Sequence, residues 1–407
     1  MRNRLLAATL LAAAACGGGS SSQPDAAGAN PDAPPNTPDG PAAKVALTIH
    51  GKGAKLLAVR EDGGAWQAQT VPADGLVHVE IANGPYEVAM VCDQPDFFDV
   101  GLMRLAPSDG VDVQAYCTPD ATVEVTPPID SITAVGPYVT RTGSPLKVVP
   151  GTYDVVSIDR STTPPRMVIQ RDVAISAATT LDLDFATGVA MRAITVTAPA
   201  EDPLAIDVST SLTTAKGATV RLGIIDEKAW VAPASALVAG DVQRARVDVY
   251  PADPSGDRAA SRVVGATDDS VAITLPADFT SAAATWNNGP SFTWQAPGTW
   301  QTVETYAGDA DYLHLWDASV FEGWAAAKGV PTTIATPDLT SLPGWQASWT
   351  TPAATGLNWG VSLYAEDADH TRRLIGRYAD FGGTQMRADS AAQRDAHLAA
   401  LRARRGR

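Results

Sequence analysis

The residue types that most often carry out chemistry are sparse in this chain of 407 residues, and their spacing defines no familiar site. No His-Glu-x-x-His, Gly-x-Ser-x-Gly, P-loop or Cys-x-x-Cys motif occurs. Three of the five histidines, His50, His78 and His314, stand in alternating strand-like runs, which favours solvent-facing or hydrogen-bonded side chains over metal ligands. The sequence therefore predicts no catalytic centre, no metal site and no cofactor.

Carboxylates suited to acid–base work on a glycosidic bond occur in the C-terminal half, but nothing in their spacing selects a pair. They are Glu304, Asp311, Asp317 and Glu322. The stretch EDADH, residues 366–370, gathers oxygen ligands of the kind that Ca²⁺ prefers, as does GDADY, residues 308–312. EDADH lacks the glycine and the alternating Asp spacing of a dedicated calcium loop, and we interpret both stretches as solvated turns.

Tryptophan shows the strongest compositional asymmetry, since nine of the ten lie within residues 230–359. Clustered exposed Trp side chains stack on sugar rings or anchor protein partners, whereas each sandwich core needs only one or two aromatic residues. Trp294 and Trp316 lie inside strand-like runs, and we expect both in a core. Trp300 and Trp324 lie in irregular segments. We expect these two to be exposed, as candidate binding residues for a glycan or a surface protein.

The N-terminus has the form of an export signal. Residues 1–4 are basic, and residues 5–15 form an uncharged apolar run, too short for a spanning helix of ~20 residues. The run ends in AAACG, residues 13–17, which resembles the lipobox of bacterial lipoproteins. That resemblance implies that Cys16 is diacylated and becomes the new N-terminus, although the family prefers Leu where Ala13 stands. Ordinary signal cleavage at the same bond, releasing a soluble protein, is the alternative.

Two features favour the anchored form. Residues 16–43 are rich in Gly, Ser, Pro, Asp, Ala and Asn, a composition that forms an extended tether rather than a core. If Cys16 is lipidated, Cys92 and Cys117 are left to pair in an oxidising compartment; otherwise an exported chain carries an odd thiol. The resemblance implies attachment to the outer membrane, because Gly17 rather than Asp follows the cysteine. Both the periplasmic and the surface face stay open.

From residue 44 onward the dominant pattern has a period of two. Runs such as KVALTIHG and LVHVEIANG alternate apolar and polar residues and end at Gly, Pro or Asp. The chain holds 34 glycines and 30 prolines spread along its length, which suits many short strands joined by turns. A spacing of roughly 8–12 residues between such runs predicts β-sandwiches.

An internal repeat divides the first part of this region. NGPYEVAMV, residues 83–91, matches PGTYDVVSI, residues 150–158, in its Gly-x-Tyr-acidic-Val pattern. This pattern resembles the small Ig-like modules that bacterial surface proteins carry in tandem. We therefore expect one β-sandwich over residues 44–122 and a second over residues 123–196. Residues 197–276 continue in the same style, and whether they form a separate module stays open.

Residues 277–385 resemble a fibronectin type III module. The resemblance rests on SFTWQAP, DYLHLWDAS, TTIATPDLTSLPGW and NWGVSLYAEDA, and the chain departs from the family in VFEGWAAAKGV and WQASWTTPAATGLNW. Residues 386–407 then predict a basic helix that begins near Ser390. This helix would be either a solvated tail or a contact with anionic lipid.

The formal net charge of −15 disfavours nonspecific binding to nucleic acid, because phosphates would be repelled. We expect an all-β, tandem-sandwich lipoprotein that acts as a non-catalytic binding or structural module. The alternative is a glycan-binding protein or a carbohydrate-active enzyme with its site in the Trp-rich C-terminal half.

Overall fold

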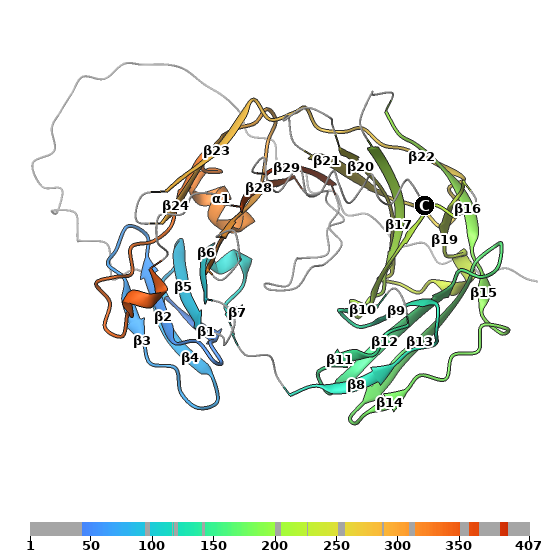
Figure 1. Ribbon diagram of the computed structural model, residues 1–407, viewed down its shortest axis with the longest axis horizontal. Helices are drawn as coiled ribbons and strands as arrows, with labels where there is room; N and C mark the ends of the chain where they lie inside the picture. Colours follow the sequence, from blue (N-terminus) through green and yellow to red (C-terminus); the bar gives the residue numbers. More distant parts are fainter. Residues whose placement is uncertain are drawn as a thin grey trace, which may run out of the picture. The chain divides into compact units, whose positions relative to one another are not determined.

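The computed structural model describes residues 43–93, 98–115, 117, 121–140, 143–199, 205–225, 227–250, 257–286, 289–308, 314–350, 358–365 and 383–389. All of them belong to one compact unit, Ala43–Arg407. The predicted all-β fold is confirmed, since strands dominate and the described residues contain a single short α-helix, α1, Glu322–Lys328 (Figure 1). That helix is not long and apolar enough to span a membrane, and the described residues contain no other candidate.

The first seven strands form a two-sheet unit that we call the first repeat. In one sheet, β1 pairs with β4 in antiparallel and with β7 in parallel; the strands of the other sheet run in the order β3-β2-β5-β6. Alternating side chains of both sheets meet in a core that includes Leu47, Ile49, Val88 and Leu105. The strands are β1 Lys44–His50, β2 Leu56–Glu61, β3 Gln67–Gln69, β4 Leu76–Ala82, β5 Tyr86–Asp93, β6 Phe98–Leu105 and β7 Asp112–Gln114.

The same topology occurs twice more along the chain. In the second repeat the sheets run β11-β8-β14 and β10-β9-β12-β13-β15, and in the third they run β19-β16-β22 and β18-β17-β20-β21. Tyr86 on β5 and Tyr153 on β12 hold equivalent places, so the sequence repeat corresponds to a structural one. The strands are β8 Val123–Thr126, β9 Ser131–Val135, β10 Tyr138–Thr140, β11 Leu146–Val148, β12 Gly151–Asp159, β13 Arg166–Ile175, β14 Thr179–Thr180, β15 Val189–Ala190, β16 Arg192–Thr197, β17 Ala205–Thr213, β18 Thr219–Gly223, β19 Ala229–Val231, β20 Val242–Tyr250, β21 Asp257–Val263 and β22 Ser270–Ala272.

The remaining strands form a different unit, the C-terminal sandwich. Its sheets run β23-β24-β27 and β26-β25-β28-β29. The strands are β23 Ser281–Trp286, β24 Pro290–Gln295, β25 Thr302–Gly308, β26 His314–Val320, β27 Thr333–Ala335, β28 Asn358–Ala365 and β29 Gly383–Asp389. The two stretches that depart from the family pattern contain α1 and the 3₁₀ turn η3, Ala347–Trp349. Residues 386–389, the first part of the predicted C-terminal helix and tail segment, end β29, and the helix predicted to begin near Ser390 lies outside the described residues.

Edge strands of three units join into one twelve-stranded sheet. β26 of the C-terminal sandwich pairs in parallel with β6 of the first repeat over seven residues, from His314 opposite Phe98 to Val320 opposite Arg104. At the other edge of the same sandwich, β29 pairs in antiparallel with β21 of the third repeat. The paired residues are 216 positions apart in the β6–β26 ladder and 122–130 positions apart in the β21–β29 ladder.

The second repeat is joined to the third through side chains. Its strand β13 holds the place of β6 and β21 but contains a bulge opposite Tyr153–Val155, where Asp172 has a φ of 57°. Arg171 in this bulge binds Asp154 at 2.9 Å and, through its other terminal nitrogen, Asp241 of the third repeat at 2.6 Å. Bulges interrupt the regular edge that another strand would need. At this bulge the second repeat therefore contacts the third repeat through the side chain of Arg171, and not through hydrogen bonds between strands.

Candidate functional site

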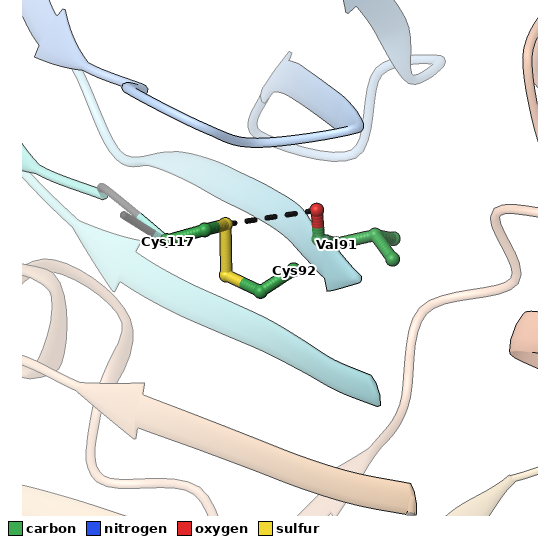
Figure 2. The surroundings of a disulfide bond; sticks show 3 residues. All are labelled: Val91, Cys92 and Cys117. Atoms are coloured by element: carbon green, nitrogen blue, oxygen red, sulfur yellow. Dashed lines mark hydrogen bonds between the residues drawn. A yellow bond between two sulfur atoms is a disulfide. The ribbon is translucent and has the colours of Figure 1, made fainter. Parts of the chain in front are cut away.

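The two body cysteines form the expected disulfide. Cys92 on β5 is bonded to Cys117, 25 positions later, and the Cys117 sulfur lies 3.7 Å from the carbonyl oxygen of Val91 (Figure 2). A disulfide sulfur carries no proton, so this approach is a contact rather than a hydrogen bond. Cys16, the predicted lipidation site, lies outside the described residues.

Trp300 is not exposed, so that part of the sequence prediction is wrong. Its side chain is only 7% accessible and packs in the core cluster that contains Trp294, Trp316 and Val303. Its indole N–H donates a hydrogen bond of 3.0 Å to the carbonyl oxygen of Pro297, which satisfies the only polar group of the ring. An irregular backbone segment therefore does not imply an exposed side chain, because a loop also delivers large apolar groups to a core.

Trp324 is only partly buried, and it lies where the first repeat meets α1. The guanidinium of Arg104, on β6, lies 5.3 Å from the centre of its ring. Asp109, in the 3₁₀ turn η1 (Pro107–Asp109), accepts the backbone N–H groups of Gly323 and Trp324 at 2.5 and 3.2 Å. These N–H groups have no intrahelical acceptor at a helix start, so a residue 215 positions earlier caps α1. Trp324 thus serves a contact between units.

The tryptophan cluster as a whole is a shared core. Nine of the ten Trp side chains belong to, or pack against, one apolar cluster, and Trp230 belongs to another. Leu56, Val91 and Leu102 of the first repeat lie in the same cluster, on the face of their sheet opposite to the repeat's own core. Trp349 is 1% exposed and donates its indole N–H to Asp93 of β5 at 3.2 Å. The Trp bias therefore reflects packing of the C-terminal sandwich on the first repeat.

Two histidines, His50 and His78, agree with the sequence interpretation. His78 is exposed, with its ring nitrogen 3.3 Å from the hydroxyl of Thr48, and His50 lies 2.7 Å from Asp112 at the edge of the first repeat. The stretch EDADH and Asp311 lie outside the described residues. Among the residues that are described, no three His, Cys, Asp or Glu side chains gather as a metal site would require.

The structure brings together two of the four carboxylates that the sequence singled out. On β25, Glu304 and Tyr306 alternate with Val303 and Thr305, and on β26 Asp317 lies directly opposite Tyr306. Glu304 and Asp317 consequently share the face of the sheet that points away from the Trp-rich core. Glu322 is elsewhere, in the first turn of α1. Sequence spacing could not select this pair, because the two residues meet only through the β25–β26 register.

A third carboxylate, Asp99 on β6, completes the group and was missed from the sequence. It lies on the same face, opposite Cys92 on β5 and Leu315 on β26. Burial raises the pKa of Asp317 well above its ordinary value, and the negative charge of Asp99, a hydrogen bond to Asp99 and the charge of Glu304 act in the same direction. Burial also raises the pKa of Asp99, which the hydrogen bond from Asp317 partly offsets. Both pKa values are raised, so the two carboxyl groups share a proton more readily than exposed carboxyls would.

The polar groups beyond this pair form hydrogen bonds across the neighbouring strands. The Tyr364 hydroxyl donates to Glu304 at 2.7 Å, and Arg387 on β29 donates to the Tyr306 hydroxyl at 2.9 Å. Arg387 also lies over the Tyr306 ring, 5.5 Å from its centre. Such contacts order the face and hold its charges in place.

The polar face continues into the third repeat as an arginine–aspartate network. Arg246 and Asp248, both on β20 and both buried, are joined by a bond of 2.7 Å. Arg221 on β18 bonds the other oxygen of Asp248 at 2.6 Å and the hydroxyl of Ser209 at 2.7 Å. Buried charges of this kind are tolerated only when they are paired and hydrogen-bonded. We interpret the network as structural.

No protein-family model matches the chain, and no curated protein matches its sequence.

Proposed function

We propose that this chain is an exported lipoprotein, held at the outer membrane through Cys16, whose all-β body is a non-catalytic binding or structural module. The disulfide supports export, because such bonds form and persist in oxidising compartments. It also uses both cysteines of the body, so the thiol of Cys16 is the one left for acylation. Two or more acyl chains give stable attachment, since a single chain binds only marginally.

The observation that carries the structural role is the use of the tryptophans. The side chains that would form a sugar-binding surface pack instead between the C-terminal sandwich and the first repeat. This packing and the β6–β26 and β21–β29 ladders connect the units of the body to one another. They favour a structural role over a sugar-binding one. Glycan binding remains the second candidate through Trp324, whose ring is partly accessible.

The first experiment is the intact mass of the mature N-terminal peptide from membrane fractions. A diacyl or triacyl mass on Cys16 that disappears in the Cys16→Ser variant is the expected result. An unmodified peptide beginning at Cys16, recovered from the soluble fraction, would refute the anchor.

A second experiment separates the structural role from glycan binding. Wild type and Trp324→Ala are assayed for binding to a panel of polysaccharides. The structural proposal expects no binding by either. Binding by wild type that is lost in Trp324→Ala would establish the glycan-binding alternative.

A further inference from the structure

The two strands that join the first repeat to the C-terminal sandwich carry carboxylates side by side. β6 and β26 run in parallel, and Asp317 is opposite Gly101, so a Cβ placed on Gly101 would lie 3.5 Å from an Asp317 oxygen. Asp99, two residues before Gly101, lies on the same face and is hydrogen-bonded to Asp317. The other oxygen of Asp99 is buried and has no hydrogen-bond partner among the described residues. Two negative charges in this arrangement would repel each other across the junction.

The charges around the pair are mainly acidic. On the same face, β25 presents Glu304 and Tyr306, while β5 presents the uncharged Met90 and Cys92. Arg387, two strands beyond β25, binds the Tyr306 hydroxyl. The strands β1 and β7, which pack over this face, present Leu47, Ile49 and Val113 to it, while His50 and Asp112, paired with each other, lie on the opposite face of their sheet.

We propose that the β6–β26 junction is a pH-sensitive latch, held closed by one proton shared between Asp99 and Asp317 and weakened when that proton is lost. With the proton present, the pair is a single hydrogen bond across the junction. Without it, two negatively charged carboxylates lie next to each other and beside a third, Glu304. Their repulsion destabilises the β6–β26 ladder. The latch controls how firmly the first and last units of the chain are joined.

The direction of the pH dependence follows from the numbers of protons that the folded and unfolded states bind. Both groups have raised pKa values in the folded chain, so between the ordinary carboxyl value and the folded value the folded state binds more protons than the unfolded state. Stability then falls as pH rises through that interval. The junction is firmest in mild acid and loosens towards alkaline pH, which is the opposite of the trend produced by a carboxylate paired with a cation.

The test is hydrogen exchange at β26, measured by mass spectrometry on the whole mature chain and corrected for the intrinsic pH dependence of exchange. Between about pH 5 and about pH 8, we expect wild-type β26 amides to lose protection by tenfold or more, because each unit of pKa elevation is a tenfold change in an equilibrium constant. Peptides from β12 in the second repeat serve as an internal reference and should change much less.

The decisive variant is Asp317→Asn, whose amide still donates to Asp99 but cannot ionise. Its β26 protection should depend on pH much less than that of wild type, because the repulsion between two carboxylates is gone and only the burial of Asp99 remains. Asp74→Asn, at an exposed turn of the first repeat, should behave like wild type. Glu304→Gln removes a charge that raises the pKa of Asp317, so the loss of protection should be smaller and should end at lower pH than in wild type.

Equal pH dependence in wild type and Asp317→Asn would overturn the proposal, as would an equal loss of protection at β26 and β12. If Asp317→Asn does not fold, Asp99→Asn removes the charge of Asp99 but leaves Asp317 buried, so the pH dependence should become smaller than in wild type without vanishing. A pH dependence in Asp99→Asn as large as that of wild type would then refute the latch.

Discussion

Asp109 offers the sharpest test of how the first repeat is attached to the C-terminal sandwich. Its carboxylate accepts the N–H of Ala106 within its own turn at 2.8 Å, and the N–H groups of Gly323 and Trp324 at the start of α1. In Asp109→Ala all three donors lose their acceptor, and α1 loses its cap. A lost cap costs ~1 kcal/mol, and hydrogen bonds to charged groups contribute ~1.5–3 kcal/mol each. Because water reaches this partly exposed site, we expect a net destabilisation of about 2 kcal/mol.

The assay is urea unfolding followed by tryptophan fluorescence, since Trp324 and the cluster around it report on this junction. The matched control is Asp74→Ala, which removes the same charge where Asp74 accepts one exposed N–H, that of Leu76, at 3.1 Å. The control should stay within about 0.5 kcal/mol of wild type. If unfolding has more than one step, the loss should fall on the step that changes Trp emission. An Asp109→Ala variant no less stable than the control would refute the long-range cap.

Three further variants test the other connections. The double variant Cys92→Ser, Cys117→Ser should lower the free energy of unfolding by ~3 kcal/mol, because it opens a closed loop of the first repeat. Calorimetry under oxidising conditions measures this loss. Wild type that is equally stable with and without reductant would contradict the prediction. Gly323→Ala should destabilise α1 despite the higher helix propensity of Ala, since an added Cβ would lie 2.8 Å from an Asp109 oxygen; Gly329→Ala is no control here, because its φ of 83° is itself unfavourable for Ala. Arg171→Met leaves the fully buried carboxylate of Asp241 without its cation, so we expect a loss of ~3–5 kcal/mol by urea unfolding, and a loss below 1 kcal/mol would show that the contact is dispensable.

Contacts between segments that are distant in the chain explain why the sequence wrongly predicted an exposed Trp300. Trp294 and Trp316 stand in alternating strands, and the alternation correctly places both in a core. Trp345 and Trp349, four residues apart, would share a face in a strand, yet Trp349 ends the turn η3 and the two rings meet edge to face at 5.6 Å. The local pattern of apolar and polar residues does not reveal which strands from elsewhere in the chain pack against a given side chain. The core beneath Trp300 is made partly by such residues.

The class of fold, the strand pattern and the repeat marked by Tyr86 and Tyr153 could be predicted from the sequence, as could the Cys92–Cys117 bond once Cys16 is set aside as the predicted lipidation site. These features are local or combinatorial: a period of two assigns a strand, and two remaining thiols in an oxidising compartment have one way to pair. Only the tertiary structure decided that the third repeat shares the topology of the first two, that Asp109 caps a helix far along the chain, and that Asp99 meets Asp317. The physical reason is that edge-strand pairing is made by backbone groups common to all residues, so the partner of an edge is chosen by the whole fold rather than by its own sequence.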